Sequence, residues 1–200
     1  MKIYVPGIQS EFIMVSRREI LATSCAALAS AGIAGCSRAD LGLAKTGYLQ
    51  LKTVTLRWGH DGRTYQDRPL WLLFGGDGDR IDGRYDPEFL VDAVGAPDDV
   101  VVGEGRHREL GGRFEVKYGL GFCGEDFADD DERIGCRNTW TSRDDFNRVQ
   151  FGDRAEVGLS NDRFEVHSVS ENEVRTDGAE VTTFDFAELH DDHGIDPDRW

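Results

Sequence analysis

The chain has 200 residues, with 38 Asp and Glu against 23 Lys and Arg, which gives a formal net charge of −15. Hydrophobic residues make up 39% and charged residues 30%, so the composition is globular and excludes collagen-like, low-complexity and multi-span membrane proteins. One domain with its own core is expected at this length. The negative charge also argues against a nucleic-acid partner, because such a surface repels phosphate groups.

Residues 14–36 have the layout of an export signal. Arg17 and Arg18 form a charged start, residues 20–34 are weakly apolar and free of charge, and small residues then lead to Cys36. The apolar stretch is too short for a stable membrane span. Residues 1–13 carry no pattern and are either an overlong start of the sequence or a long leader. In both cases they would be removed with the signal, so the predicted export signal covers residues 1–35.

Paired arginines before a weak apolar stretch resemble a twin-arginine signal, which exports proteins already folded. The run Ile33-Ala34-Gly35-Cys36 is similar to the lipobox of lipoprotein precursors. The resemblance implies that Cys36 is lipidated on its sulfur and becomes the first mature residue. It also implies more than one acyl chain, which gives stable attachment. The expected location is the outer face of the cytoplasmic membrane, with residues 36–47 as the lipidated Cys and a tether.

The acidic residues have a particular composition. Of the 38 acids 24 are Asp, and of the 23 basic residues only 4 are Lys. Short carboxylates with few lysines resemble the surface chemistry of proteins from extreme halophiles. At molar salt the Debye length is about 3 Å, so the self-repulsion of such a surface is largely screened. The acidic runs are therefore interpreted chiefly as solvated surface.

The region 48–190 is predicted to be a β-rich globular domain, an antiparallel β-sandwich or barrel with one or two short helices. Residues 48–58 predict a strand with a bulge or a strand that bends between sheets, because their apolar set changes face. Residues 70–74 are a continuous apolar run, which predicts a strand buried on both faces. Residues 113–122 alternate strictly between apolar and polar or glycine, as expected for a strand with one wet face.

Three further elements are predicted from local signals. Residues 86–94 have the capping Asp, the early Pro and the terminal Gly of a short helix. Residues 155–166 predict an antiparallel hairpin turning at Asn161 and Asp162. A second, weaker helix is predicted over residues 186–190, and residues 191–200 are expected to form an acidic C-terminal tail.

Two cysteines remain for the mature domain, since Cys25 leaves with the signal and Cys36 carries lipid. Outside the cytoplasm two such thiols most simply pair, which predicts a disulfide between Cys123 and Cys136. A zinc site is the alternative, but neither cysteine has a second one at zinc-finger spacing.

Two groups of residues are candidate metal ligands. Asp77, Asp79 and Asp82 lie in a Gly-rich run that resembles a calcium loop, although its register does not fit an EF-hand. His190 and His193 form a partial site for a transition metal. Solvated surface is the favoured interpretation of both groups, so no cofactor is predicted, with Ca²⁺ or a transition metal as the alternative.

Motifs for nucleophilic, zinc-protease and phosphate-binding chemistry are missing from the sequence. We therefore expect an exported, lipid-anchored surface protein that acts as a non-catalytic binding or interaction module, with the membrane as one partner. Its ligand, whether protein or small molecule, is left open. The alternative is a small exported enzyme that uses carboxylates or a bound divalent metal.

Overall fold

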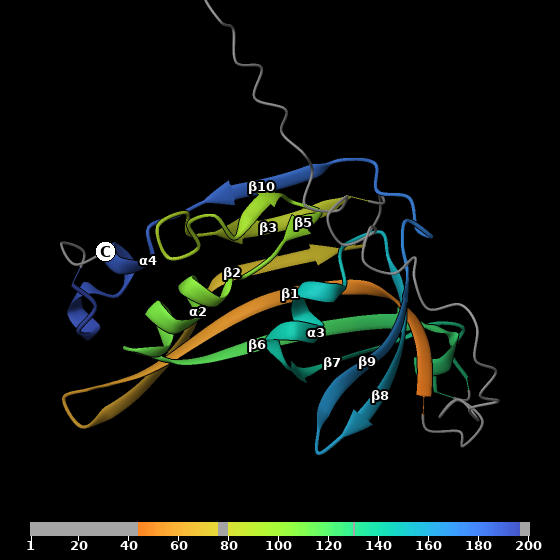
Figure 1. The fold of residues 1–200 in the computed structure, drawn as a ribbon, viewed down its shortest axis with the longest axis horizontal. Helices are drawn as coiled ribbons and strands as arrows, with labels where there is room; N and C mark the ends of the chain where they lie inside the picture. Colours follow the sequence, from red (N-terminus) through yellow and green to blue (C-terminus); the bar gives the residue numbers. More distant parts are fainter. Residues whose placement is uncertain (1–43, 76–79, 130, 197–200) are drawn as a thin grey trace, which may run out of the picture. The chain divides into compact units, whose positions relative to one another are not determined.

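A computed structural model describes residues 44–75, 80–129 and 131–196, all of which belong to one compact unit, residues 37–200 (Figure 1). The unit is mainly β, as predicted. Its strands are β1 (Ala44–His60), β2 (Arg63–Phe74), β3 (Ile81–Tyr85), β4 (Val94–Ala96), β5 (Asp99–Val100), β6 (Glu115–Gly124), β7 (Gly135–Thr141), β8 (Arg154–Ser160), β9 (Arg163–Ser170) and β10 (Ala179–Thr183). Its helices are α2 (Glu104–Gly111), α3 (Arg143–Arg148) and α4 (Phe186–Leu189), with 3-10 turns η2 (Glu125–Phe127) and η3 (Asp191–His193).

Eight strands form one sheet in the order β10-β3-β2-β1-β6-β7-β9-β8, and an additional pairing of β1 with β8 closes five of them into a barrel. The barrel order is β1-β6-β7-β9-β8, with β7 and β9 parallel over only two residue pairs. These five strands form a small mixed barrel, since β7 and β9 are parallel and the other four pairings are antiparallel. Here β2 to β5 and α2 are inserted between its first two strands, and β2 and β3 extend the sheet beyond the barrel.

Strand β1 belongs to both parts of the sheet, which confirms the predicted bend. Residues 44–48 pair with β8, whereas residues 51–60 pair with β2. Against β6 the register shifts between Leu49 and Leu51, where β1 has one residue more than its partner. Such a bulge bends a strand and increases its twist, so one long strand serves both the barrel and its extension.

The predicted hairpin is also confirmed. Strands β8 and β9 pair antiparallel, and Asn161 and Asp162 occupy the turn with φ of 51° and 57°. Two left-handed residues in succession make the mirror-image turn that matches the right-handed twist of paired strands. Asn and Asp tolerate this conformation better than other non-glycine residues, which explains why the sequence signals the turn.

The predicted helix over residues 86–94 is wrong. Asp86 does accept hydrogen bonds from the backbone N–H groups of Glu88 and Phe89, as a cap should. However, residues 87–93 form successive turns, and the chain then enters β4. Asp92 has a φ of 60°, which a continuing helix does not permit. The second predicted helix, over 186–190, is confirmed as α4.

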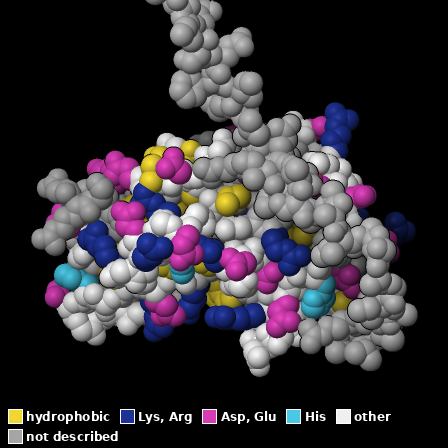
Figure 2. Space-filling view, viewed as in Figure 1, with side chains coloured by type: hydrophobic (Ala, Val, Ile, Leu, Met, Phe, Trp, Pro, Cys, Tyr) yellow, Lys and Arg dark blue, Asp and Glu magenta, His cyan; other side chains and the backbone are white. Residues whose placement is uncertain are grey.

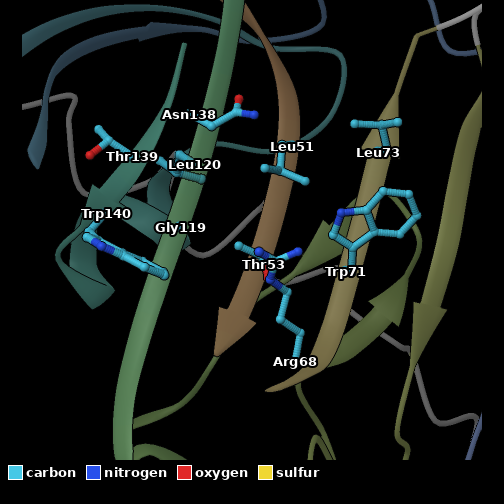
Figure 3. A pocket seen from close by; sticks show the side chains of 10 residues that line it. All are labelled: Leu51, Thr53, Arg68, Trp71, Leu73, Gly119, Leu120, Asn138, Thr139 and Trp140. Carbon is cyan, nitrogen blue, oxygen red and sulfur yellow. The ribbon is translucent and has the colours of Figure 1, made fainter. Parts of the chain in front are cut away.

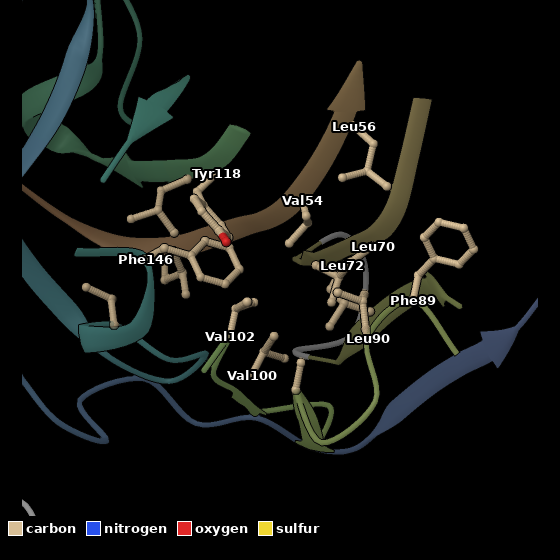
Figure 4. Close-up of a cluster of buried hydrophobic side chains, with 14 of the residues drawn as sticks. Val54, Leu56, Leu70, Leu72, Phe89, Leu90, Val100, Val102, Tyr118 and Phe146 are labelled. Carbon is tan, nitrogen blue, oxygen red and sulfur yellow. The ribbon is translucent and has the colours of Figure 1, made fainter. Parts of the chain in front are cut away.

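The core lies on the face of the sheet that the segment between β3 and β6 covers (Figure 4). Val54 and Leu56 of β1 and Leu70 and Leu72 of β2 point to this side and are fully buried. The residues that cover them come from the turns after β3, from β5 and the connection that follows it, and from α3, namely Phe89, Leu90, Val100, Val102 and Phe146. Because alternate residues of a strand point to opposite faces, the side chains between these core residues on β1 and β2 point to the other side of the sheet.

The disulfide between Cys123 and Cys136 is present, as predicted. The two residues are directly opposite each other in the register of β6 and β7. The bond therefore ties together the ends of two barrel strands on either side of a 12-residue connection. Closing a loop of this length contributes about 3 kcal/mol in the loop-entropy account.

Candidate functional site

A pocket of about 440 Å³ lies on the outer face of the sheet, opposite the core (Figure 3). This volume is within the range of small-molecule sites, about 300–1,000 Å³. Four neighbouring strands line it, β2, β1, β6 and β7. The lining residues are Leu51, Thr53, Arg68, Trp71, Leu73, Gly119, Leu120, Asn138, Thr139 and Trp140. We call this pocket the outer groove.

Register explains why residues so far apart in sequence meet in the outer groove. Trp71, Thr53, Gly119 and Trp140 are successive cross-strand partners in one row across the four strands. Because paired residues share a face, both tryptophans stand on the same side of the sheet. The row spans three strand spacings, about 14 Å between the tryptophan Cα atoms. Two half-buried indoles therefore stand at the two sides of one groove, as Figure 3 shows.

Glycines form the floor between the two tryptophans. A Cβ on Gly119 would lie 2.6 Å from Cγ2 of Thr53 and 3.6 Å from the Trp140 ring. In the next row, a Cβ on Gly121 would clash with Oδ1 of Asn138 and lie 2.8 Å from Cβ of Leu51. Neighbouring side chains thus lean over both glycines, and any larger residue would fill the groove.

A bulge in β2 turns the side chain of Arg68 toward the outer groove. Between the pairs Val54–Leu70 and Leu56–Asp67, β2 has one residue more than β1. Pro69 lies in this irregularity, where its missing N–H breaks no ladder hydrogen bond. Bulges re-aim neighbouring side chains, and here Arg68 is exposed and lines the groove instead of continuing the inward set of Leu70 and Leu72.

Charge at the groove differs from that of the whole chain. Arg68 is the single charged residue among the ten that line it, and none of the ten is acidic. At its border Nζ of Lys117 lies 5.6 Å from the centroid of the Trp140 ring. The same ammonium lies 3.0 Å from Oε1 of Glu115 and hydrogen bonds to it, which lowers the pKa of that exposed carboxyl. Elsewhere, on the face shown in Figure 2, acidic side chains are scattered among basic ones.

A buried lysine lies directly behind the groove. Lys52, between Leu51 and Thr53 in the sequence, points into the core and is fully buried. Its Nζ donates to the carbonyl oxygens of Val100, Phe146 and Val149 at 2.8–2.9 Å. Burial lowers the pKa of Lys52 well below its ordinary value, and the charges of Asp153 and Asp99 partly oppose that shift. These hydrogen bonds hold β1, which forms part of the groove floor, against the segments that contain Val100, Phe146 and Val149.

Tyr118 also points inward from the floor of the groove, on β6. Its hydroxyl lies 2.9 Å from Nδ1 of His107 on α2. Burial raises the pKa of Tyr118 to about 12, opposed by Arg143 and supported by Glu104. The phenol is therefore neutral at physiological pH and serves as a hydrogen-bonding contact between the sheet and α2.

Of the predicted metal ligands, the structure describes Asp82, His190 and His193. Asp77 and Asp79 lie outside the described residues, as do Cys36, Arg17 and Arg18. Asp82 is on β3, with Oδ1 at 2.9 Å from Nε of Arg80. Among the residues that the structure describes, no group of three or more His, Cys, Asp or Glu is placed to hold a metal ion.

His190 and His193 belong to a packed aromatic cluster rather than to a solvated tail. Their ring centroids are 5.8 Å apart, and Nε2 of His190 lies 2.9 Å from Oδ2 of Asp67. The carbonyl oxygen of His193 accepts a hydrogen bond from Nε1 of Trp58. Ile195 is buried as well. The chain up to residue 195 therefore packs on β1 and β2, which differs from the acidic tail expected from residue 191.

Sequence reasoning missed the outer groove. The run 70–74 was expected to be buried on both faces, and this expectation is wrong: Leu70 and Leu72 are buried, whereas Trp71 and Leu73 are half-exposed groove residues. A signal was available in the predicted wet face of 113–122, where glycines stand at positions 119 and 121. Large apolar residues on one strand beside glycines on another indicate a groove once the strands are paired.

Comparison with protein-family models, with curated proteins and with solved structures finds no match to this chain. In residues 44–75, 80–129 and 131–196, no helix is long and apolar enough to cross a membrane. The fold and its pocket thus define a β-barrel domain with a ligand-sized groove on the outer face of its sheet.

Proposed function

We propose that this protein is an exported, lipid-anchored binding module of the cell surface, and that the outer groove is its ligand site. The observation that carries the proposal is the row of Trp71, Thr53, Gly119 and Trp140, which places two half-exposed indoles over a floor of small residues. Exposed apolar patches rimmed by polar residues commonly mark ligand or interaction sites, and tryptophan is enriched at interfaces. Connectivity alone carries no function, since one fold hosts many activities.

Chemistry of the lining favours binding over catalysis. General acid–base catalysis needs a group that exchanges protons near the working pH. The ten lining residues include no His, Cys, Asp, Glu, Lys or Tyr. The two hydroxyls, of Thr53 and Thr139, donate to the backbone carbonyls of Leu70 and Asp162. The groove can hold a ligand by contact and hydrogen bonding, and it offers no base to activate a nucleophile.

The proposed anchor would hold the domain close to the membrane. Strand β1 begins at Ala44, so seven residues separate it from Cys36. Fully extended, seven residues reach about 25 Å. A lipidated Cys36 would thus confine the domain to the surface layer of the cell. Molar salt at that surface would suit the Asp-rich, Lys-poor composition.

Replacing Cys36 by Ser tests the anchor. We expect Cys36→Ser to move the protein from the membrane fraction to the soluble exported fraction, because the acylated sulfur is lost. Cys25→Ser is the matched control, since that residue is removed with the signal, and it should leave the distribution unchanged. Membrane retention of Cys36→Ser would contradict the anchor.

The indole signals of the four tryptophans test the ligand site. In ¹H–¹⁵N NMR spectra of the full chain in molar KCl, we expect a ligand to shift the Trp71 and Trp140 indole signals and to leave buried Trp58 unchanged. The panel contains neutral and acidic oligosaccharides, an oligonucleotide and lipid vesicles. If every member leaves Trp71 and Trp140 unmoved, or if shifts are confined to other residues, the outer groove is not the ligand site.

A further inference from the structure

Resting on the proposed function, we infer that the outer groove binds a neutral oligosaccharide, laid across the strands from Trp71 to Trp140. The class of ligand follows from three properties of the lining: two separate aromatic platforms, polar side chains between and beside them, and the near absence of charge. Each property excludes a different competing occupant.

The two aromatic platforms suit a chain of rings. A sugar ring has an apolar face of C–H groups, which packs on an indole, and a rim of hydroxyls, which does not need to be buried. Trp71 and Trp140 are both half-buried, so part of each ring remains exposed to a ligand. Their separation of three strand spacings is too long for one ring to bridge. A ligand touching both must therefore be extended.

Polar groups accompany the platforms. Asn138 stands beside Trp140 on β7 and is exposed, and its amide offers both donors and acceptors. Arg68 lies toward the Trp71 side and offers donors only (Figure 3). The hydroxyl groups of a sugar can donate to the amide of Asn138 and can accept from both Asn138 and Arg68. A purely apolar occupant would instead remove these groups from water without compensation, which is unfavourable.

The small number of charged side chains at the groove favours a neutral ligand over an anionic one. A polyanion binds by releasing counterions from several neutralised phosphates or carboxylates, and it needs several cations. The groove is lined by one, Arg68. The next cation, Lys117, is paired with Glu115 at 3.0 Å, and the chain as a whole has a net charge of −15. A cationic ligand is disfavoured too, because no carboxylate lines the groove. A neutral chain of hydroxylated rings satisfies all three properties.

The experiment titrates the full chain in molar KCl with named probes and follows the Trp71 and Trp140 indole signals. Neutral probes are cellohexaose, maltohexaose and mannohexaose. The competing classes are represented by hexagalacturonate, a ten-residue oligothymidylate and phosphatidylglycerol vesicles. We expect at least one neutral hexasaccharide to shift both indole signals and to bind more tightly than hexagalacturonate.

Variants check that the binding uses the groove. We expect Trp71→Ala and Trp140→Ala each to weaken binding of the neutral hexasaccharide about tenfold or more, and Asn138→Leu to weaken it by a smaller factor at similar side-chain volume. Leu189→Ala removes an exposed apolar side chain elsewhere and should leave binding unchanged. Melting temperatures of the variants show that each is folded.

The outcomes are distinct. If hexagalacturonate, oligothymidylate or vesicles shift the two indole signals and no neutral hexasaccharide does, the ligand class is overturned while the groove remains the binding site. Equal binding of hexagalacturonate and neutral sugar overturns the argument from charge and with it the inference. If no probe reaches the groove, the inference and the proposed site fail together.

Discussion

We expect Lys52→Met to lower the free energy of unfolding by about 4 kcal/mol. The ammonium of Lys52 donates to Val100 O, Phe146 O and Val149 O, and lies 3.1 Å from Oε1 of Gln150. Phe146 and Val149 stand in and just after the last turn of α3, where a cation is favoured by the helix dipole. Methionine matches the stem in size but leaves these carbonyl groups buried without their donor.

Lys52 also sets a pH dependence. Its pKa is lowered in the folded protein, whereas in the unfolded chain it has the ordinary value of about 10.4. Between these two values the unfolded state binds the additional proton, so the free energy of unfolding rises with pH, by up to about 1.4 kcal/mol per pH unit. Below the folded pKa and above 10.4 the two states bind equal numbers of protons at this group, and the dependence disappears.

Urea unfolding at a series of pH values from neutral to about 10 checks both expectations. Lys52→Met should be less stable than the natural chain at neutral pH and should lack the alkaline rise. Lys45→Met is the matched control, since Lys45 is exposed on the same strand, and should change stability little. A Lys52→Met protein with unaltered stability and the same alkaline rise would show that this ammonium does not fasten β1 to α3 and β5.

The sequence predicted the elements whose cause is local. A period-two alternation identifies β6, and two turn-forming residues identify the β8–β9 hairpin. The disulfide between Cys123 and Cys136 follows from the count of cysteines outside the predicted signal and lipidation site. Each follows from neighbours in the chain or from simple elimination. The change of face within residues 48–58 likewise predicted the bend that lets β1 join two parts of the sheet.

Features that depend on strand register were not predictable in this way. The groove requires Trp71 of β2 and Trp140 of β7 to stand in one row, which only the pairings through β1 and β6 establish. A continuous apolar run is equally compatible with a doubly buried strand and with a strand that has one ligand-facing side. Lys52 shows the same limit, because a lone lysine in a strand is normally an exposed charge.

The failed helix over residues 86–94 has a different cause. Its capping signal is real, but the carboxylate of Asp86 serves two segments at once. Oδ1 accepts from the N–H groups of Glu88 and Phe89 at 2.7 and 2.8 Å, while Oδ2 accepts from the N–H of Phe186 at 2.5 Å. The side chain is 1% exposed. Asp86 therefore joins the turns after β3 to the start of α4, which no local pattern reveals.

We expect Asp86→Ala to lower the free energy of unfolding by about 4 kcal/mol, since three buried N–H groups lose a charged acceptor. Asp86→Asn should be intermediate: its remaining oxygen can still accept from Glu88 and Phe89, while its amide nitrogen faces the N–H of Phe186. Asp185→Ala is the control within the same region. Asp185 is exposed and accepts only from Glu188 N at 2.8 Å, so its loss should lower stability by about 1 kcal/mol.

Two measurements separate docking of α4 from general stability. Urea unfolding reports the free energy, and Trp58 fluorescence reports the packing of α4, because the Trp58 ring lies 5.9 Å from Phe186 and 5.1 Å from His190. Asp86→Ala should alter the Trp58 emission under native conditions, whereas Asp185→Ala should not. If both variants lose equal stability with unchanged emission, Asp86 acts only as a local cap, and the link between β3 and α4 must come from the apolar contacts of Phe89 with Phe186.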